Sequence, residues 1–223
     1  MNAVNGHTAK RSNSASGLTG AAGLPTIVGI TGGIGSGKTT IARELEQRGY
    51  PVYYTDREAK RIIRENPMVR SGIESLFGSE VFEGERYHTE LVARQVFAHP
   101  ELLERLNRIV HPAVGFDLKH WSKRQEGWCF VESAILYESG LDELCDCIVA
   151  VVADEETRLR RALARDYQDA EQDNIDKVRA RIRAQMGDDE LRQRADYILE
   201  NPEGAKPEQL AELLIRHLKD NYS

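Results

Sequence analysis

A glycine-rich segment near the start of the chain constrains its fold more than any other feature of the sequence. Residues 32–39 read GGIGSGKT and fit the pattern G-x-x-x-x-G-K-[S/T]. An apolar, β-branched run precedes it at 26–31, and an amphipathic helical pattern follows at 38–48. A strand, a glycine-rich turn and a helix in this order are the context in which such a loop binds phosphate. We therefore predict a phosphate-binding loop, and the context disfavours the alternative of an ordinary glycine-rich turn.

The residue types of this loop indicate its ligand. Glycine permits positive φ and close approach, so successive backbone N–H groups can point at an anion. Lys38 begins the helix and is expected to reach the β- and γ-phosphates, while the Thr39 hydroxyl is expected to bind Mg²⁺. A nucleoside triphosphate with Mg²⁺ is the predicted ligand. The residues expected to hold it are Gly33, Ile34, Gly35, Ser36, Gly37, Lys38, Thr39 and Thr40.

Composition excludes several other classes of protein. The chain has 223 residues and a net charge of −6, which argues against a general nucleic-acid binder. No apolar run approaches the roughly 18–20 residues that cross a bilayer, so no membrane is expected as a partner. Three cysteines do not form a disulfide framework and suit a reducing compartment, so we expect a cytoplasmic protein. A monomer and a small homo-oligomer are both compatible with the sequence.

Segments of strand and helix character alternate from residue 25 onward. Residues 1–24 have no periodic apolar face and are interpreted as a disordered arm or an expression remnant, with an interaction tail as the alternative. Strand patterns are expected at 26–31, 51–54, 128–133, 146–153 and 197–199, the second of them ending at Thr55-Asp56. Helical patterns are expected at 38–48, 68–77, 89–97, 100–110, 112–125, 155–166, 174–186 and 207–218. Pro112 is placed at the first turn of its helix, where proline is tolerated.

This order of elements predicts a three-layer α/β domain with a mainly parallel sheet. The predicted core covers about 25–56 and 126–223, with a helical substrate-binding insertion at about 57–125 and a helical lid at about 155–190. No Asn-Lys-x-Asp motif is present, which disfavours a GTPase. A small domain with a phosphate-binding loop, a helical insertion and a basic lid helix is typical of a small-molecule kinase.

The loop and six later segments resemble dephospho-coenzyme A kinases, in the same order along the chain. The resemblance covers about 26–218 and implies a P-loop kinase fold. The loop itself is common to many kinases, whereas the ordered set is specific. The resembling segments are Thr31–Thr40, Tyr54–Ala59, Asn107–Pro112, Ala134–Leu141, Thr157–Asp166, Arg181–Met186 and Ala195–Asn201.

The resemblance implies phosphorylation of the ribose 3′-hydroxyl of dephospho-CoA by ATP, which gives coenzyme A and ADP. It makes Asp56 the general base or orienter of that hydroxyl, on a strand expected beside the loop strand. A helix N-cap for the segment from Arg57 is the alternative role. Glu132 is expected to hold Mg²⁺ through water, or to be only an acid at a strand end. Two positions depart from the family pattern, Tyr54 and Ala134, and they leave the fine geometry of the site open.

Three arginines of the lid segment are spaced along one helical face. Arg161 and Arg165 lie four apart, and Arg158 precedes Arg161 by three, so the guanidiniums are expected to form one stripe. A phosphate would relieve their repulsion, and the resemblance makes Arg161 and Arg165 catalytic lid residues. The alternative is a solvated face that pairs with nearby acidic side chains.

Three further residues are assigned a role only by the resemblance to this family. His111 and Glu138 are expected on the acceptor side, although His111 could simply begin a helix. Asn201 is expected near the adenine of ATP, although an ordinary Asn-Pro turn explains it equally well. The competing functions are another small-molecule or nucleoside monophosphate kinase, and a nucleotide-binding regulatory module without transfer chemistry.

Overall fold

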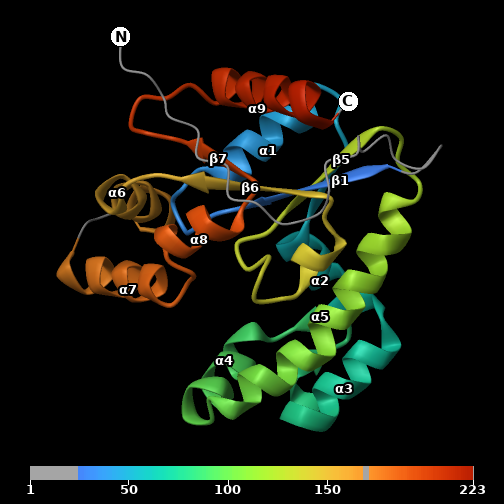
Figure 1. The fold of residues 1–223 in the computed structure, drawn as a ribbon. Coiled ribbons are helices and arrows are strands. Elements are labelled where there is room, and N and C mark those ends of the chain that lie inside the picture. The colour runs from blue at the N-terminus through green and yellow to red at the C-terminus, as the bar shows by residue number, and fades with distance from the viewer. Residues whose placement is uncertain (1–24, 168–170, 223) are drawn as a thin grey trace.

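A computed structural model describes residues 25–167 and 171–222 of the chain. The predicted arm at 1–24, three residues of the predicted lid (168–170) and Ser223 lie outside the described residues. A five-stranded sheet runs through the middle of the molecule, and all of its strand pairs are parallel (Figure 1). Its strands are β1 (Thr26–Thr31), β2 (Val52–Tyr54), β5 (Trp128–Glu132), β6 (Cys147–Val152) and β7 (Tyr197–Glu200). The expected α/β class with a parallel sheet is confirmed.

The order of the strands differs from one expectation. It runs β2-β5-β1-β6-β7, so β5 lies between the loop strand β1 and the strand that leads to Asp56. The expectation that these two strands are neighbours was wrong, because pattern alone does not show which strand is inserted between two others. The register pairs Ile30 of β1 with Glu132 of β5 and Glu132 with Tyr54 of β2. Glu132 is thereby placed between the phosphate-binding loop and Asp56.

Alternating side chains of the sheet supply two separate apolar cores. Val149 and Val151 face α1 (Lys38–Gln47) and α9 (Pro207–Tyr222), which cover one face of the sheet. Ile148 and Ala150 of the same strand face the opposite core, to which the helical insertion contributes. All six residues of β6 are buried, as expected for a strand in the middle of a parallel sheet covered on both faces. The three layers of the fold follow from this alternation.

Helices fill most of the predicted insertion. Its helices are α2 (Thr55–Glu65), α3 (Pro67–Phe77), α4 (Thr89–Ala98) and α5 (Glu101–Ser122). A one-turn helix η1 (Ser79–Val81) and a short hairpin of β3 (Phe82–Glu83) and β4 (Arg86–Tyr87) link α3 to α4. The sequence did not indicate this hairpin, since two-residue strands are too short to show a period. Figure 1 shows the insertion as a lobe at one side of the sheet.

One long helix replaces the two helices that we expected around Pro112. Helix α5 runs without interruption through Pro112, so this residue lies inside the helix and not at its first turn. His111 therefore does not begin a helix either. The residues Val110, Val114 and Leu118 form one buried stripe on both sides of the proline. Their packing against the insertion core outweighs the missing N–H of Pro112, which is the physical reason that the helix continues.

Replacing Pro112 with alanine should therefore stabilise the protein. Proline in a helix interior is about 3 kcal/mol less favourable than alanine, and part of that difference should be recovered, about 1–3 kcal/mol. Urea unfolding of Pro112→Ala and of a surface control on the same helix, Lys119→Ala, measures the effect. The control should change the free energy of unfolding by less than about 0.5 kcal/mol. A less stable Pro112→Ala would show that the packing of the proline ring contributes more than its missing N–H costs the helix.

Three helices form the region of the predicted lid and its connection to the core. They are α6 (Glu155–Asp166), α7 (Gln172–Arg183) and α8 (Asp188–Arg194), the last of which was not expected. The Asp154 side chain accepts a hydrogen bond of 2.8 Å from the Thr157 N–H and caps α6. After β5, a short helix η2 (Leu141–Leu144) leads to β6. Within the described residues, no helix is both long and apolar enough to cross a membrane.

Candidate active site

The phosphate-binding loop connects the carboxyl end of β1 to the first residue of α1. Gly35 and Gly37 adopt positive φ angles of 77° and 91°, which side chains other than glycine rarely tolerate. Gly37 occupies the N-cap position of α1 without a side-chain cap, so the first N–H groups of that helix remain available to an anion. A side chain at Gly32 would meet the carbonyl oxygen of Val151 at 2.2 Å. The loop geometry that the sequence predicted is present.

Lys38, Thr39 and Glu132 meet at the end of this loop. The Thr39 hydroxyl donates a hydrogen bond of 2.9 Å to Oε1 of Glu132. The Lys38 Nζ lies 3.9 Å from the same oxygen, and both charged residues are buried. The structure thus brings together the predicted phosphate lysine and both predicted metal ligands. A buried ion pair of this kind is tolerated because each charge offsets the desolvation of the other.

Asp56 faces the same group from the first turn of α2. The helix begins at Thr55, one residue before Asp56, and its N-cap is Tyr54. Asp56 is therefore neither the end of a strand nor the N-cap, the two placements that the sequence suggested. Thr55 is buried and Asp56 is exposed, so the carboxylate is accessible to solvent. Of the two acids that act on Lys38, Glu132 is buried and Asp56 is the one that an acceptor can reach.

Burial and charge shift the pKa values of this group in opposing ways. Burial lowers the pKa of the Lys38 ammonium, whereas Glu132 and Asp56 raise it. Burial also raises the pKa of Glu132, against the effects of Lys38 and of the hydrogen bond from Thr39, and Asp56 adds to the rise. Asp56 therefore acts electrostatically on both Lys38 and Glu132. Two carboxylates and one ammonium share this small region, an arrangement typical of a site that handles phosphate and a cation.

The donor set fits Mg²⁺ together with a phosphate ligand. Thr39 and Glu132 offer the hydroxyl and carboxylate oxygens that Mg²⁺ prefers. Among the described residues, no group of three or more histidine, cysteine or acidic side chains could enclose a metal ion by itself. Such an open set suits Mg²⁺, which is commonly bound by one or two protein oxygens and substrate phosphates. The hydroxyl oxygen of Ser36 is buried and has no hydrogen-bond partner in the described part of the chain.

Asn201 connects the loop after β7 to the phosphate-binding loop. Its side-chain amide donates a hydrogen bond of 2.7 Å to the carbonyl oxygen of Ser36. Arg161 donates to the carbonyl oxygens of Asn201 and Pro202 at 3.2 and 3.0 Å. Asn201 is thus buried beside the predicted nucleotide loop, which an ordinary surface turn would not require. The structure brings Asn201 and Arg161 together.

The three lid arginines do not form the expected stripe of free guanidiniums. Arg158 is only 4% exposed, pairs with Asp188 at 2.7 Å, and donates to the carbonyl oxygen of Ile34 at 3.1 Å. Arg165 pairs with Asp166, its neighbour in sequence, at 2.7 Å and is partly exposed. The sequence pattern gives the helical face of each arginine but not its partner. Arg165 retains the exposure that a contact with nucleotide needs, whereas Arg158 does not.

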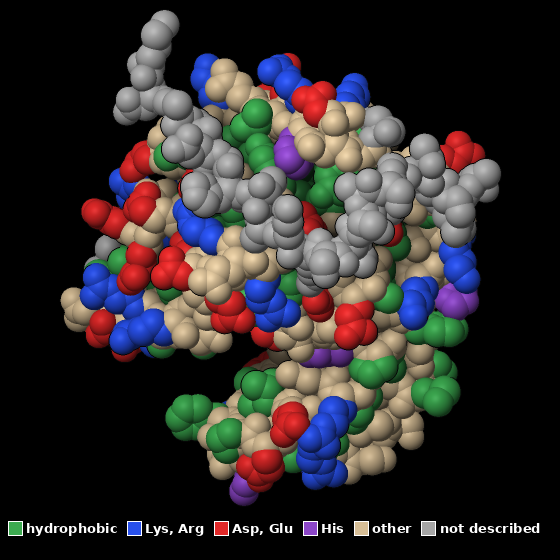
Figure 2. Space-filling view, viewed as in Figure 1, with side chains coloured by type: hydrophobic (Ala, Val, Ile, Leu, Met, Phe, Trp, Pro, Cys, Tyr) green, Lys and Arg blue, Asp and Glu red, His purple; other side chains and the backbone are tan. Residues whose placement is uncertain are grey.

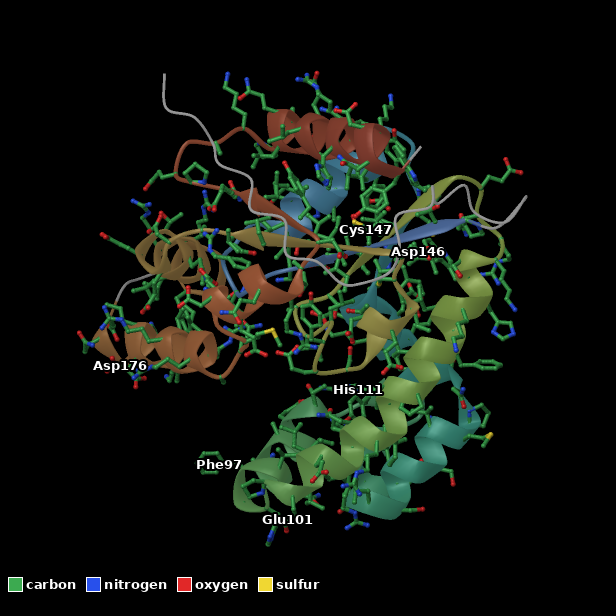
Figure 3. The ribbon with its side chains drawn as sticks, viewed as in Figure 1. Phe97, Glu101, His111, Asp146, Cys147 and Asp176 are labelled. Carbon is green, nitrogen blue, oxygen red and sulfur yellow. The ribbon has the colours of Figure 1, made fainter. Side chains whose placement is uncertain are left out.

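No hydrogen bond or ion pair in the described part of the chain joins the two predicted acceptor residues, His111 and Glu138, to this group. His111 is half-buried in α5, between the insertion lobe and the sheet (Figure 3), and burial lowers its pKa. Glu138 is exposed in the turn that follows β5. Figure 2 shows a notch between the insertion lobe and the lid region. Neither residue is placed against Asp56 by a contact of the described residues.

Comparison with known protein families gives a consistent result. The family model described as dephospho-CoA kinase matches residues 26–206. A protein of Bacteroides fragilis (strain YCH46) named dephospho-CoA kinase is 41% identical over 182 residues, which cover 81% of this chain and 86% of that protein. The match therefore includes both the loop and the lid region.

Solved structures share the fold. The crystal structure of TT1252 from Thermus thermophilus has a TM-score of 0.74 and 36% identity, covering 88% of this chain and 98% of that one. A shikimate kinase from Acinetobacter baumannii in complex with shikimate has a TM-score of 0.52 at 20% identity, covering 89% of this chain and 94% of that one. The second likeness shows the fold alone.

Proposed function

This chain belongs to the dephospho-CoA kinase family, and we propose that it transfers the γ-phosphoryl group of ATP to the ribose 3′-hydroxyl of dephospho-CoA, giving coenzyme A and ADP. The observation that carries the acceptor side of this proposal is the placement of Asp56. Its exposed carboxylate stands on α2 and acts electrostatically on the buried pair of Lys38 and Glu132. Phosphoryl transfer asks a protein mainly for positioning and for stabilisation of charge.

On the nucleotide side, Lys38 and the loop amides hold the phosphates. The positive end of α1 and the Lys38 ammonium stabilise the negative charge that develops on the transferred group and on ADP. Glu132 keeps this ammonium oriented, since the two charged groups are 3.9 Å apart in a buried position. Thr39 and Glu132 would hold Mg²⁺, which when bound neutralises charge on the β- and γ-phosphates.

On the acceptor side, Asp56 orients the 3′-hydroxyl and accepts its proton. The hydroxyl must approach in line with the bond between the γ-phosphorus and its leaving oxygen, so the base must stand at the open side of the loop. Asp56 is exposed there, whereas Glu132 is buried and bonded to Thr39. This difference supports separate roles for the two acids, with Asp56 on the acceptor and Glu132 on the metal.

The lid residues complete the nucleotide site. Asn201 forms the end of the site that takes the adenine, because its side chain joins the loop after β7 to the phosphate-binding loop. Arg161, a catalytic residue of the lid, joins α6 to the same loop after β7. Arg165 is free to turn from Asp166 toward the phosphates, since its side chain is more than half exposed. Residues 155–190 act as the lid, which excludes water from the transferred group.

The insertion at about 57–125 takes the rest of the acceptor. Burial keeps His111 neutral near pH 7, so its ring can both donate and accept a hydrogen bond. Glu138 is exposed and can reach the acceptor from the turn after β5. Phe97 projects from the end of α4 with 91% of its surface exposed and offers apolar area for an extended ligand (Figure 3).

The location of the protein and its oligomeric state remain predictions. The three cysteines form no disulfide, which supports a cytoplasmic location. We predict a monomer or a small homo-oligomer.

The proposal is tested by ADP release in the presence of ATP, Mg²⁺ and one acceptor at a time. Dephospho-CoA should support fast turnover, whereas AMP and shikimate should not. Mass spectrometry of the product should locate one added phosphoryl group on the ribose 3′-oxygen. Equal turnover of AMP or shikimate would favour another small-molecule kinase. ATP binding without ADP release for any of the three acceptors would favour a regulatory module.

A further inference from the structure

We propose that Gln185 is a positioning residue for ATP: its side-chain oxygen holds the Ile34 peptide of the phosphate-binding loop in the conformation that receives the nucleotide. The inference rests on the proposed function only in naming ATP as the ligand. Gln185 belongs to the segment Arg181–Met186, to which the reaction described above gives no role. It lies just beyond the last residue of α7, far from the loop in sequence.

Both backbone polar groups of Ile34 are bound by side chains of the lid region. The Ile34 N–H donates a hydrogen bond of 2.7 Å to Oε1 of Gln185. The Ile34 carbonyl oxygen accepts a hydrogen bond of 3.1 Å from Nε of Arg158. Arg158 is held in turn by Asp188 at 2.7 Å. Ile34 is thus fixed on two sides by residues that lie more than a hundred positions away.

The Ile34 side chain adds an apolar contact to these polar ones. It packs against the small core that α6 and α7 share, formed by Ala162, Val178 and Ile182. Glycines flank it because α6 lies directly on the loop. A Cβ atom at Gly33 would come within 2.0 Å of Nη2 of Arg158, and one at Gly35 within 2.2 Å of the Arg158 carbonyl oxygen. These two glycines therefore make room for the lid helix as well as for a phosphate.

The residues around Gln185 are anchored, so its side chain is held in place before any ligand binds. Ile182 belongs to the lid core, while Met186 packs against the large core of the sheet and insertion. Gln185 thus lies at the seam between the two, with its amide oxygen directed at Ile34. A preorganised acceptor of this kind costs little ordering entropy when the ligand arrives. The amides of Gly35 and of the loop residues after it are the ones expected to bind the phosphates, and their directions depend on the backbone conformation of Ile34.

The test compares Gln185→Met with Gln172→Met in the full chain. Methionine has a similar length but lacks the acceptor oxygen, so the Ile34 N–H loses its partner. Gln172 is a matched control, since it is an exposed glutamine at the start of α7, the helix that Gln185 follows, and its amide donates to Asp176 at 2.9 Å. Calorimetric titration measures the Kd for ATP with Mg²⁺, and hydrogen exchange followed by mass spectrometry measures protection of the loop peptide.

We expect Gln185→Met to weaken ATP binding about threefold to tenfold, the effect of one lost neutral hydrogen bond. Backbone amides of the loop should exchange faster, while the KM for dephospho-CoA stays within about twofold of the wild type, because the acceptor does not depend on this contact. Gln185→Glu keeps an acceptor oxygen and should restore slow exchange. Gln172→Met should change neither measurement.

Unchanged loop exchange in Gln185→Met, or an unchanged Kd for ATP, would overturn the proposal. So would an equal effect of Gln172→Met, which would indicate a general loosening of α7. Neither binding nor exchange requires turnover. Failure of the wild type to phosphorylate dephospho-CoA would therefore reject the proposed function and leave this inference to be judged on its own data.

Discussion

Asp56→Asn should lower kcat with dephospho-CoA by about a hundredfold to ten-thousandfold, the usual contribution of a positioned general base. Asparagine keeps the size of the side chain and its place in the first turn of α2, but it cannot accept the proton of the 3′-hydroxyl. ATP binding should change little, because Asp56 is exposed and outside the phosphate-binding loop. Steady-state ADP release and a separate ATP titration distinguish the two effects.

A matched acidic residue on the same helix provides the control. Glu65 is the last residue of α2 and is exposed, with only a long ion pair to Arg61 of 3.4 Å. Glu65→Gln removes the same charge at the far end of the helix and should leave kcat within about twofold of the wild type. Retention of more than about a tenth of kcat by Asp56→Asn would remove Asp56 from the role of base. Phosphoryl transfer would then proceed without a general base, and Asp56 would serve only to orient the 3′-hydroxyl.

Local pattern predicted the elements of the fold well where the signal was strong. The apolar run before the loop, the apolar strand at 147–152 and the helix that begins at Glu155 all occur where expected. Each depends on residues that are close in sequence, such as Asp154 and Thr157. The same holds for the loop itself, whose residues Gly35 and Gly37 adopt the positive φ angles that a phosphate-binding loop requires.

Features that depend on residues far apart in the sequence, such as the order of the strands, could not be predicted in the same way. The insertion of β5 between β1 and β2 depends on the pairing of whole strands, which no local period encodes. Pro112 remains inside α5 because tertiary packing of an apolar stripe outweighs a local rule. Each wrong prediction also gave a site residue the wrong surroundings. The strand order changes the neighbours of Asp56, and the uninterrupted helix α5 changes those of His111.

The contacts of the lid region show the same limit at the level of single side chains. Helical spacing placed Arg158 on one face with Arg161, and that face was interpreted as a phosphate-binding stripe. The partners of Arg158 are Asp188 and Ile34, which lie 30 and 124 positions away. Gln185 has no local signal at all and could have been found only as part of a resembling segment. The sequence therefore predicted the chemistry of the phosphate-binding loop, but not the contacts of Arg158 and Gln185 that hold the loop in place.

Besides Asp56→Asn, Lys38→Met should have the largest effect, because it should lower both kcat and the free energy of unfolding. Loss of the ammonium removes a preorganised positive charge from the phosphates and should lower kcat about a hundredfold to a thousandfold. It also leaves Glu132 buried without its cation. Burial already raises the pKa of Glu132 against the opposing effect of Lys38, so the variant should raise that pKa further. Stopped-flow single-turnover assays measure the first effect, and urea unfolding measures the second.

The stability effect of Lys38→Met has a predicted dependence on pH. A carboxyl group whose pKa is raised on folding binds more protons in the folded state, so stability falls as pH rises from its ordinary pKa to the raised value. Lys38→Met should therefore lose more stability relative to wild type at about pH 7.5 than at about pH 5. Adding Glu132→Gln should abolish this extra slope, because an amide does not titrate. An equal loss at both pH values would mean that Glu132 does not depend on Lys38 for its charge, and that the lysine serves the nucleotide alone.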